Sequence, residues 1–200
     1  MRYIKIFFIL LIPFILTACF IPERRLYFSW NRPAEQKDLC NYEFNVSSNM
    51  NLIETERGIM IDTDKEIYYR LNEEKPYNIE DYVYVMNEVI SFMSNNKSCI
   101  LVVEGHADII GQGKGDRNLK LSERRASVIR DVILSSGFSH NRVKIFPYSD
   151  IMPKYTNDIN KNRRVNFIAL KCETDLDNYE KYYNNYYSNI ITNQSNYMEK

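Results

Sequence analysis

The chain has 200 residues, and its 26 Lys and Arg side chains balance 26 Asp and Glu side chains, so the formal charge at neutral pH is zero. Without an excess of basic groups the protein has no electrostatic footprint for nucleic acid, which excludes a protein that holds DNA or RNA by its backbone charge. The length suits one domain of ordinary size with flanking segments.

The amino-terminal segment has the pattern of a secretory signal. Arg2 and Lys5 stand at the start of an uncharged stretch, 6–17, which Pro13 interrupts. This stretch is shorter than the roughly 20 apolar residues of a membrane-spanning helix, and small residues follow it, as in secretory signals. The alternative is an uncleaved anchor with an incidental cysteine. We predict a signal peptide over 1–18.

The sequence LTAC, which ends at Cys19, resembles the bacterial lipobox. The resemblance implies cleavage before Cys19 and acylation of its sulfur, for instance by palmitate. Phe20 stands where an inner-membrane retention signal usually has Asp, which favours the outer membrane, with the domain facing the periplasm. The cleaved chain retains 24 basic and 26 acidic side chains, a formal charge of −2.

Residues 19–55 contain scattered polar residues and little periodicity, and we interpret them as a lipidated tether with at most one short strand. Three cysteines remain after Cys19, namely Cys40, Cys99 and Cys172. In an oxidising compartment two of them pair and leave an odd thiol, or all three are buried and unpaired. The sequence does not choose between these alternatives.

Between 56 and 172 the hydrophobic period alternates between that of strands and that of helices. Residues 58–71 read as a strand or hairpin with a turn at 62–65. Tyr82, Val85, Met86, Val89 and Met93 recur at helical spacing and predict an amphipathic helix over 80–94.

The β-branched run CILVVEG, 99–105, is typical of a strand covered on both faces. A second helix is expected over 122–135, with Ser122 as its cap and Gly137 as its stop, and further strands over 142–146 and 163–170. These elements predict an α/β (α+β) sandwich of about four strands with helices packed on one sheet.

The tail, 173–200, is crowded with Tyr and Asn and lacks a regular apolar stripe. We predict that it is mobile or weakly helical. Packing of its tyrosines on another protein is the alternative that composition leaves open.

Arg125 breaks the pattern of the second helix, because it lies on the apolar stripe between Leu121 and Ile129. A guanidinium on a buried face needs a partner, and Asp108, just past the preceding strand, lies where α/β domains usually bind ligands. Two interpretations compete: an internal Asp108–Arg125 salt bridge, or a clamp in which the carboxylate takes a ligand ammonium and the guanidinium takes a ligand carboxylate.

Other constellations carry little chemistry. His106 and Asp108 lack a third metal ligand nearby, and no Ser-His-Asp or Cys-His arrangement or phosphate-binding loop is visible. We therefore expect no metal, no cofactor and no enzymatic activity.

The run EGHADIIG, then Asn118, then LSERRA and the closing NRRV resemble the OmpA-like peptidoglycan-binding family of the Pal and MotB type. The usual family pattern is Gly-His-Thr-Asp followed by Asn-x-x-Leu-Ser-x-x-Arg-Ala, and it corresponds here to 105–108 and 118–126. The similarity covers roughly 57–171. It implies the fold above and binding of peptidoglycan stem peptides through diaminopimelate.

By this resemblance Asp108 holds the diaminopimelate ammonium and Arg125 its carboxylate, while Asn118 and Leu121 belong to the second motif. Tyr69 would line the site and Asn72 would add a polar contact. The chain departs from the pattern at Ala107, which replaces threonine, at Arg70, where an acidic residue is common, in the sequence PYSDIMP, and in a shortened 157–162 segment that lacks one arginine.

The predicted function is an outer-membrane lipoprotein that anchors the membrane non-covalently to peptidoglycan. The alternative is a structural or assembly component of an envelope or secretion complex that keeps the fold and has weak or no peptidoglycan binding. In that case the tail or residues 20–55 would hold a protein partner.

Overall fold

The computed structural model describes residues 40–109 and 116–198, with side chains up to residue 188. The predicted signal peptide, Cys19 and most of the predicted tether lie outside the described residues. None of the helices in the described residues has the length and apolar character of a membrane span. The elements are β1 Met50–Thr55, β2 Gly58–Thr63, α1 Ile79–Asn95, β3 Ile100–Gly105, α2 Asp116–Ser135, η2 His140–Arg142, β4 Val143–Pro147, η3 Ile159–Asn162, β5 Val165–Leu170 and α3 Glu173–Met198.

The described strands form one five-stranded sheet in the order β1-β2-β5-β3-β4, with β5 at its centre. Strands β3 and β4 run parallel, as α2 between them requires, and the other neighbours are antiparallel. The prediction of a mixed α/β domain is therefore confirmed.

The amino-terminal edge of the sheet differs from the prediction. Of the two alternatives for 58–71, the strand is confirmed by β2, and the hairpin with a turn at 62–65 is wrong, because β2 pairs with β1, which precedes it. The predicted domain boundary at residue 56 falls inside this hairpin. An edge strand with one face in water has a weak apolar pattern, and only Met50 of β1 is fully buried, so the alternation that identifies a strand is faint here.

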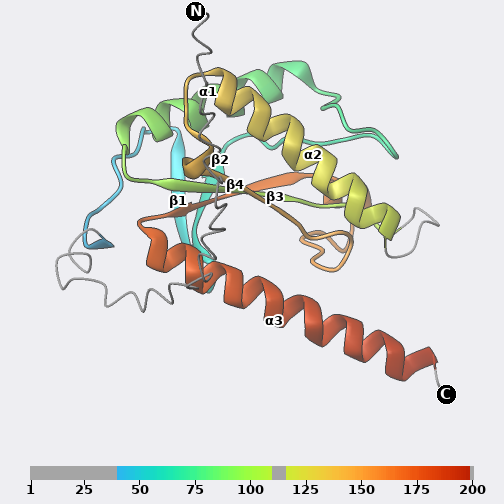
Figure 1. Ribbon diagram of the computed structural model, residues 1–200. Coiled ribbons are helices and arrows are strands. Elements are labelled where there is room, and N and C mark those ends of the chain that lie inside the picture. The colour runs from blue at the N-terminus through green and yellow to red at the C-terminus, as the bar shows by residue number, and fades with distance from the viewer. Residues whose placement is uncertain (1–39, 110–115, 199–200) are drawn as a thin grey trace, which may run out of the picture. The chain divides into compact units, whose positions relative to one another are not determined.

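Helices cover both faces of the sheet (Figure 1). On one face, core residues of α1 and α2 such as Val89 and Ile129 pack with Leu101 and Val103 of β3. On the other face, Ile100 and Val102 of β3 pack with residues of α3. Every residue of β3 is buried, which confirms a strand covered on both sides.

Helix α2 begins at Asp116, ahead of the predicted start at Ser122. Ser122 is thus no cap: its hydroxyl donates to the Leu119 carbonyl oxygen and accepts from the backbone N–H of Ser149. The helix lies so close to β3 that a Cβ at Gly105 would be 1.9 Å from the Ser122 carbonyl oxygen. At the other end, Gly137 follows the helix with φ 95°, as predicted for its stop.

Helix α3 corrects the expectation of a mobile or weakly helical tail. Leu176, Tyr179, Tyr183 and Tyr186 recur at helical spacing and pack on the sheet. The hydroxyls of Tyr183 and Tyr186 donate to the carbonyl oxygens of Pro147 and Ile151. This stripe is hard to recognise in a sequence because a tyrosine ring packs like an apolar side chain while its hydroxyl bonds to a partner at the rim.

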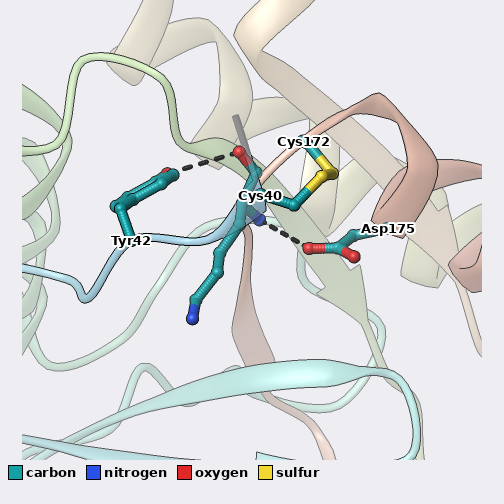
Figure 2. The surroundings of a disulfide bond; sticks show 5 residues. Cys40, Tyr42, Cys172 and Asp175 are labelled. Carbon is teal, nitrogen blue, oxygen red and sulfur yellow. Dashed lines mark hydrogen bonds between the residues drawn. A yellow bond between two sulfur atoms is a disulfide. The ribbon is translucent and has the colours of Figure 1, made fainter. Parts of the chain in front are cut away.

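A disulfide between Cys40 and Cys172 joins the start of the described chain to the junction of β5 and α3 (Figure 2). Beside it, the Tyr42 hydroxyl donates to the Lys171 carbonyl oxygen, and the Lys171 backbone N–H donates to Asp175 at the start of α3. Cys99 is buried and free. The pairing left open by the sequence is therefore resolved, and part of the predicted tether packs with the domain.

Candidate functional site

Arg125 of α2 is fully buried and donates to backbone carbonyl oxygens from two separate parts of the chain. Its Nε bonds to Glu73 at 2.9 Å, its Nη1 to His106 at 2.9 Å and its Nη2 to Arg70 at 3.1 Å. The guanidinium also lies 4.8 Å from the centre of the Tyr69 ring. Arg125 thereby fixes the 70–73 turn against the end of β3.

Burial lowers the pKa of Arg125 to about 10, with Tyr69 and Asp108 opposing the shift and Arg163 adding to it. The group therefore stays charged at neutral pH. Carbonyl oxygens supply the partners that a buried guanidinium needs, without neutralising its charge.

Asp108, just past β3, pairs with Arg163 and not with Arg125. Its carboxylate accepts from Arg163 Nη1 at 2.6 Å, and its side chain is 4% exposed. Arg163 also donates to the Tyr69 carbonyl oxygen and to the Asn160 side chain. The expected internal Asp108–Arg125 salt bridge is therefore wrong, although both residues lie at the same corner, next to His106 and Tyr69.

The other predicted site residues lie around this corner in different environments. The Asn118 side chain donates to the Asp108 backbone carbonyl oxygen at 3.2 Å, which holds the loop after β3 onto α2. Leu121 is 5% exposed, and Tyr69 is buried with a hydroxyl that has no partner among the described residues. Asn72 is exposed in the turn, with φ 61°.

A hollow of about 450 Å³ opens beside the Asp108–Arg163 pair. We call it the basic hollow, because three cationic side chains and a single carboxylate line it. Sequence reasoning identified the NRRV motif that contains Arg163 but assigned no role to that residue, and it treated Arg70 only as an obstacle. The lining residues are Tyr68, Tyr69, Arg70, Tyr77, Asp158, Asn160, Lys161 and Arg163.

A second group of buried polar side chains lies on the other face of the sheet, under α3. We call it the α3 cluster: Arg57, Glu104, His106 and Tyr179. Glu104 is fully buried and lies 3.0 Å from Arg57 Nη1, and it accepts a 2.7 Å hydrogen bond from the Tyr179 hydroxyl.

The two acid–base groups of the α3 cluster are held in defined protonation states. Burial would raise the pKa of Glu104, but the His106 ring, 3.6 Å from its carboxylate, and the charge of Arg57 lower it. Burial lowers the pKa of His106 to about 4, assisted by the charge of Arg164 and opposed by Glu104. The described residues contain no group of three or more His, Cys, Asp or Glu side chains that could hold a metal ion.

Comparisons with known proteins agree on one domain type. The OmpA family matches residues 76–166. Outer membrane porin F of Pseudomonas aeruginosa is 34% identical over 82 residues, which cover 40% of this chain and 23% of that protein. The peptidoglycan-associated lipoprotein of Mesorhizobium japonicum is 37% identical over 62 residues, which cover 31% of this chain and 36% of that protein.

This chain therefore spans well under half the length of the two relatives that it matches. The crystal structure of the periplasmic domain of Helicobacter pylori MotB superposes with a TM-score of 0.51 at 15% identity, covering 72% of this chain and 98% of that chain. At this identity the likeness concerns the fold alone. Residues 76–166, which include Asp108, Arg125 and Arg163 and end in β5, thus match the OmpA family.

Proposed function

We propose that this chain is an outer-membrane lipoprotein that anchors the membrane non-covalently to peptidoglycan. The observation that carries the proposal is the Asp108–Arg163 pair at the edge of the basic hollow, in a domain of the OmpA family. This pair presents a carboxylate and a guanidinium to a ligand that carries both an ammonium and a carboxylate group. The name of one relative, a peptidoglycan-associated lipoprotein, supports the same ligand.

The proposed ligand is the diaminopimelate of peptidoglycan stem peptides. Its ammonium takes the place of Arg163 at the Asp108 carboxylate, and the released Arg163 turns to a ligand carboxylate. Arg125 is enclosed by three carbonyl oxygens, so it contributes chiefly by holding the 70–73 turn and the His106 carbonyl in position. A direct contact of Arg125 with a carboxylate requires that turn to open.

The expected strength is modest for each domain and larger for the membrane as a whole. Charge-assisted hydrogen bonds contribute roughly 1.5–3 kcal/mol each, and ordering the ligand costs a few kcal/mol. Two such contacts give a Kd on the order of micromolar to millimolar. Many lipid-anchored copies that face one polymer raise the effective affinity through avidity.

Co-sedimentation with purified sacculi tests this function. We expect the wild type to sediment, Asp108→Ala and Arg125→Ala to remain in the supernatant, and Arg124→Ala to sediment like the wild type. Arg124 is the matched control, because it neighbours Arg125 on α2 but is exposed and pairs with Glu74. Circular dichroism of each variant separates lost binding from lost folding. A wild-type protein that stays in the supernatant would refute peptidoglycan anchoring.

The lipid anchor is a separate part of the proposal. It rests on the LTAC sequence that ends at Cys19 and on the short apolar stretch before it. Mass spectrometry of the mature amino terminus tests it, and an unmodified Cys19 would refute acylation.

An assembly role in an envelope complex is the second candidate, and α3 is the observation that favours it. The helix continues to Met198, beyond Tyr186, whose hydroxyl donates to the Ile151 carbonyl oxygen (Figure 1). Failure of the wild type to bind sacculi, together with capture of an envelope protein that depends on residues 187–198, would support this role.

A further inference from the structure

The basic hollow keeps an excess of positive charge in spite of the carboxylates near it. Arg163 is neutralised by Asp108 on its inner side. Arg70 is exposed, and its side chain makes no hydrogen bond or ion pair with the described residues. Lys161 is exposed, and its ammonium lies 5.6 Å from the centre of the Tyr155 ring, with no ion pair to a described residue. Asp158 is the single carboxylate among the lining residues, so the two free cations outnumber it.

The geometry also limits which cation a ligand can reach first. Arg125 is 0% exposed, and its guanidinium donates to three backbone carbonyl oxygens, those of Glu73, His106 and Arg70. Arg163 is engaged by three oxygens, from Asp108, Tyr69 and Asn160. An anionic group that enters the hollow therefore meets the exposed Arg70 and Lys161 with their charges available, whereas Arg163 is half-buried and already bonded, and Arg125 does not line the hollow.

We propose that Arg70 and Lys161 form a carboxylate subsite in the basic hollow and make ligand selection depend on anionic groups more than on ammonium groups. Arg70 presents a planar fork to a carboxylate, and Lys161 adds a point charge from η3. The rings of Tyr68 and Tyr77 line the same hollow and offer apolar surface to the carbon chain between charged ends. This subsite rests on the proposed function, since it specifies how the same corner chooses its ligand.

Three small probes separate the two kinds of charge. Pimelate is the carbon chain of diaminopimelate with both carboxylates and no ammonium group, and cadaverine is a diamine with no carboxylate. In titrations followed by amide chemical shifts, we expect pimelate and meso-diaminopimelate to bind with a Kd on the order of millimolar. Their shifts should concentrate at Arg70 and in 158–163. Cadaverine should cause no saturable shift.

Charge reversal assigns the effect to the two residues. Arg70→Glu and Lys161→Glu should each weaken pimelate binding by about fivefold or more, because exposed charge pairs contribute modestly and reversal adds repulsion. Arg130→Glu is the control with the same change in net charge, since Arg130 pairs with Asp131 elsewhere on α2 and does not line the hollow. It should leave the pimelate affinity unchanged.

The outcomes distinguish this subsite from the proposed function. Sacculi that sediment the wild type, with cadaverine binding as well as pimelate or with no pimelate shift at the hollow, would overturn the subsite and leave anchoring intact. Equal losses for Arg70→Glu and Arg130→Glu would overturn it too, because they would indicate a general charge effect. Pimelate binding that depends on Arg70 and Lys161 supports it even if sacculi do not sediment.

Discussion

Two regions of this domain enclose arginine side chains, and the charge of the guanidinium is stabilised differently in each. At the ligand corner, which we define as Asp108, Arg125 and Arg163, the fully enclosed guanidinium bonds to three backbone carbonyl oxygens from loops and strand ends. In the α3 cluster, the guanidinium of Arg57 meets the carboxylate of Glu104, which projects from β3 and accepts a hydrogen bond from Tyr179 of α3.

The difference indicates in which region a ligand can replace the existing bonds. At the ligand corner, a ligand in the basic hollow can replace the loop hydrogen bonds and the Asp108–Arg163 pair with bonds of its own. The Arg57–Glu104 pair lies under α3, where no ligand replaces either partner, so opening it is costly. The comparison therefore predicts that changes in the α3 cluster reduce stability, and that changes at the ligand corner reduce binding more than stability.

Glu104→Gln should have the largest effect on stability. The substitution keeps the shape but leaves Arg57 without its counter-charge, and removing one partner of a buried pair costs about 3–5 kcal/mol. Urea unfolding followed by circular dichroism measures the loss. Glu180→Gln, at an exposed position of α3, should change the free energy of unfolding by less than about 0.5 kcal/mol. A similarly small change for Glu104→Gln would contradict the expectation that the α3 cluster is the region that maintains stability.

Acidification tests the same cluster through His106, whose pKa burial lowers from 6.5 to about 4. The unfolded chain takes up this proton at higher pH than the folded domain, so the contribution is complete above about pH 6.5 and is lost as the pH falls toward 4. Across this pH range, the contribution of His106 to the free energy of unfolding changes by about 3 kcal/mol.

Unfolding free energies measured from pH 7 down to pH 5 report the slope, before most carboxylates of the unfolded chain take up protons. His106→Asn should flatten it, and His140→Asn, at an exposed position, should not. A slope that survives His106→Asn would assign the pH dependence to another group.

Much of the central fold could be predicted because its signals are local. Helix α1 has apolar residues at helical spacing, and strand β3 is an unbroken apolar run. The structure places both within about one residue of the predicted bounds. Strand β1 and helix α3 were predicted only loosely, as at most one short strand and as a mobile or weakly helical tail, for opposite reasons. The first is an edge strand with little to bury, and the second buries tyrosines, whose hydroxyls obscure an apolar stripe.

The site was only half predictable for a related reason. The position of Arg125 on an apolar stripe marked it as a buried charge that needs partners. Those partners are main-chain oxygens, which every residue has and which leave no trace in a sequence. The partner of Asp108 lies 55 residues away, at Arg163, and no period connects them.

Arg125→Lys should reduce stability by about 2 kcal/mol. A lysine keeps the charge but replaces the planar fork with one ammonium, so at least one of the carbonyl oxygens loses its donor. The larger consequence should be loss of sacculus binding, because the 70–73 turn is no longer fixed. Arg124→Lys, on the exposed side of α2, is the control for both measurements. A stability loss as large as that of Glu104→Gln, with binding retained, would reverse the assignment of the two regions.

The smallest expected effect comes from a matched pair of buried tyrosines, one in each region. The Tyr179 hydroxyl donates to Glu104 at 2.7 Å and lies 3.1 Å from the Tyr148 hydroxyl, so Tyr179→Phe should cost about 1.5 kcal/mol or more.

The Tyr69 hydroxyl, by contrast, is buried with no hydrogen-bond partner among the described residues. Tyr69→Phe removes an unsatisfied polar group and keeps the ring that lies against Arg125, so it should leave the unfolding midpoint unchanged or raise it slightly. Equal losses for the two variants would show that both hydroxyls have partners in solution. The ligand corner would then be as rigidly bonded as the α3 cluster, and the contrast between a region that opens and a region that stays closed would no longer hold.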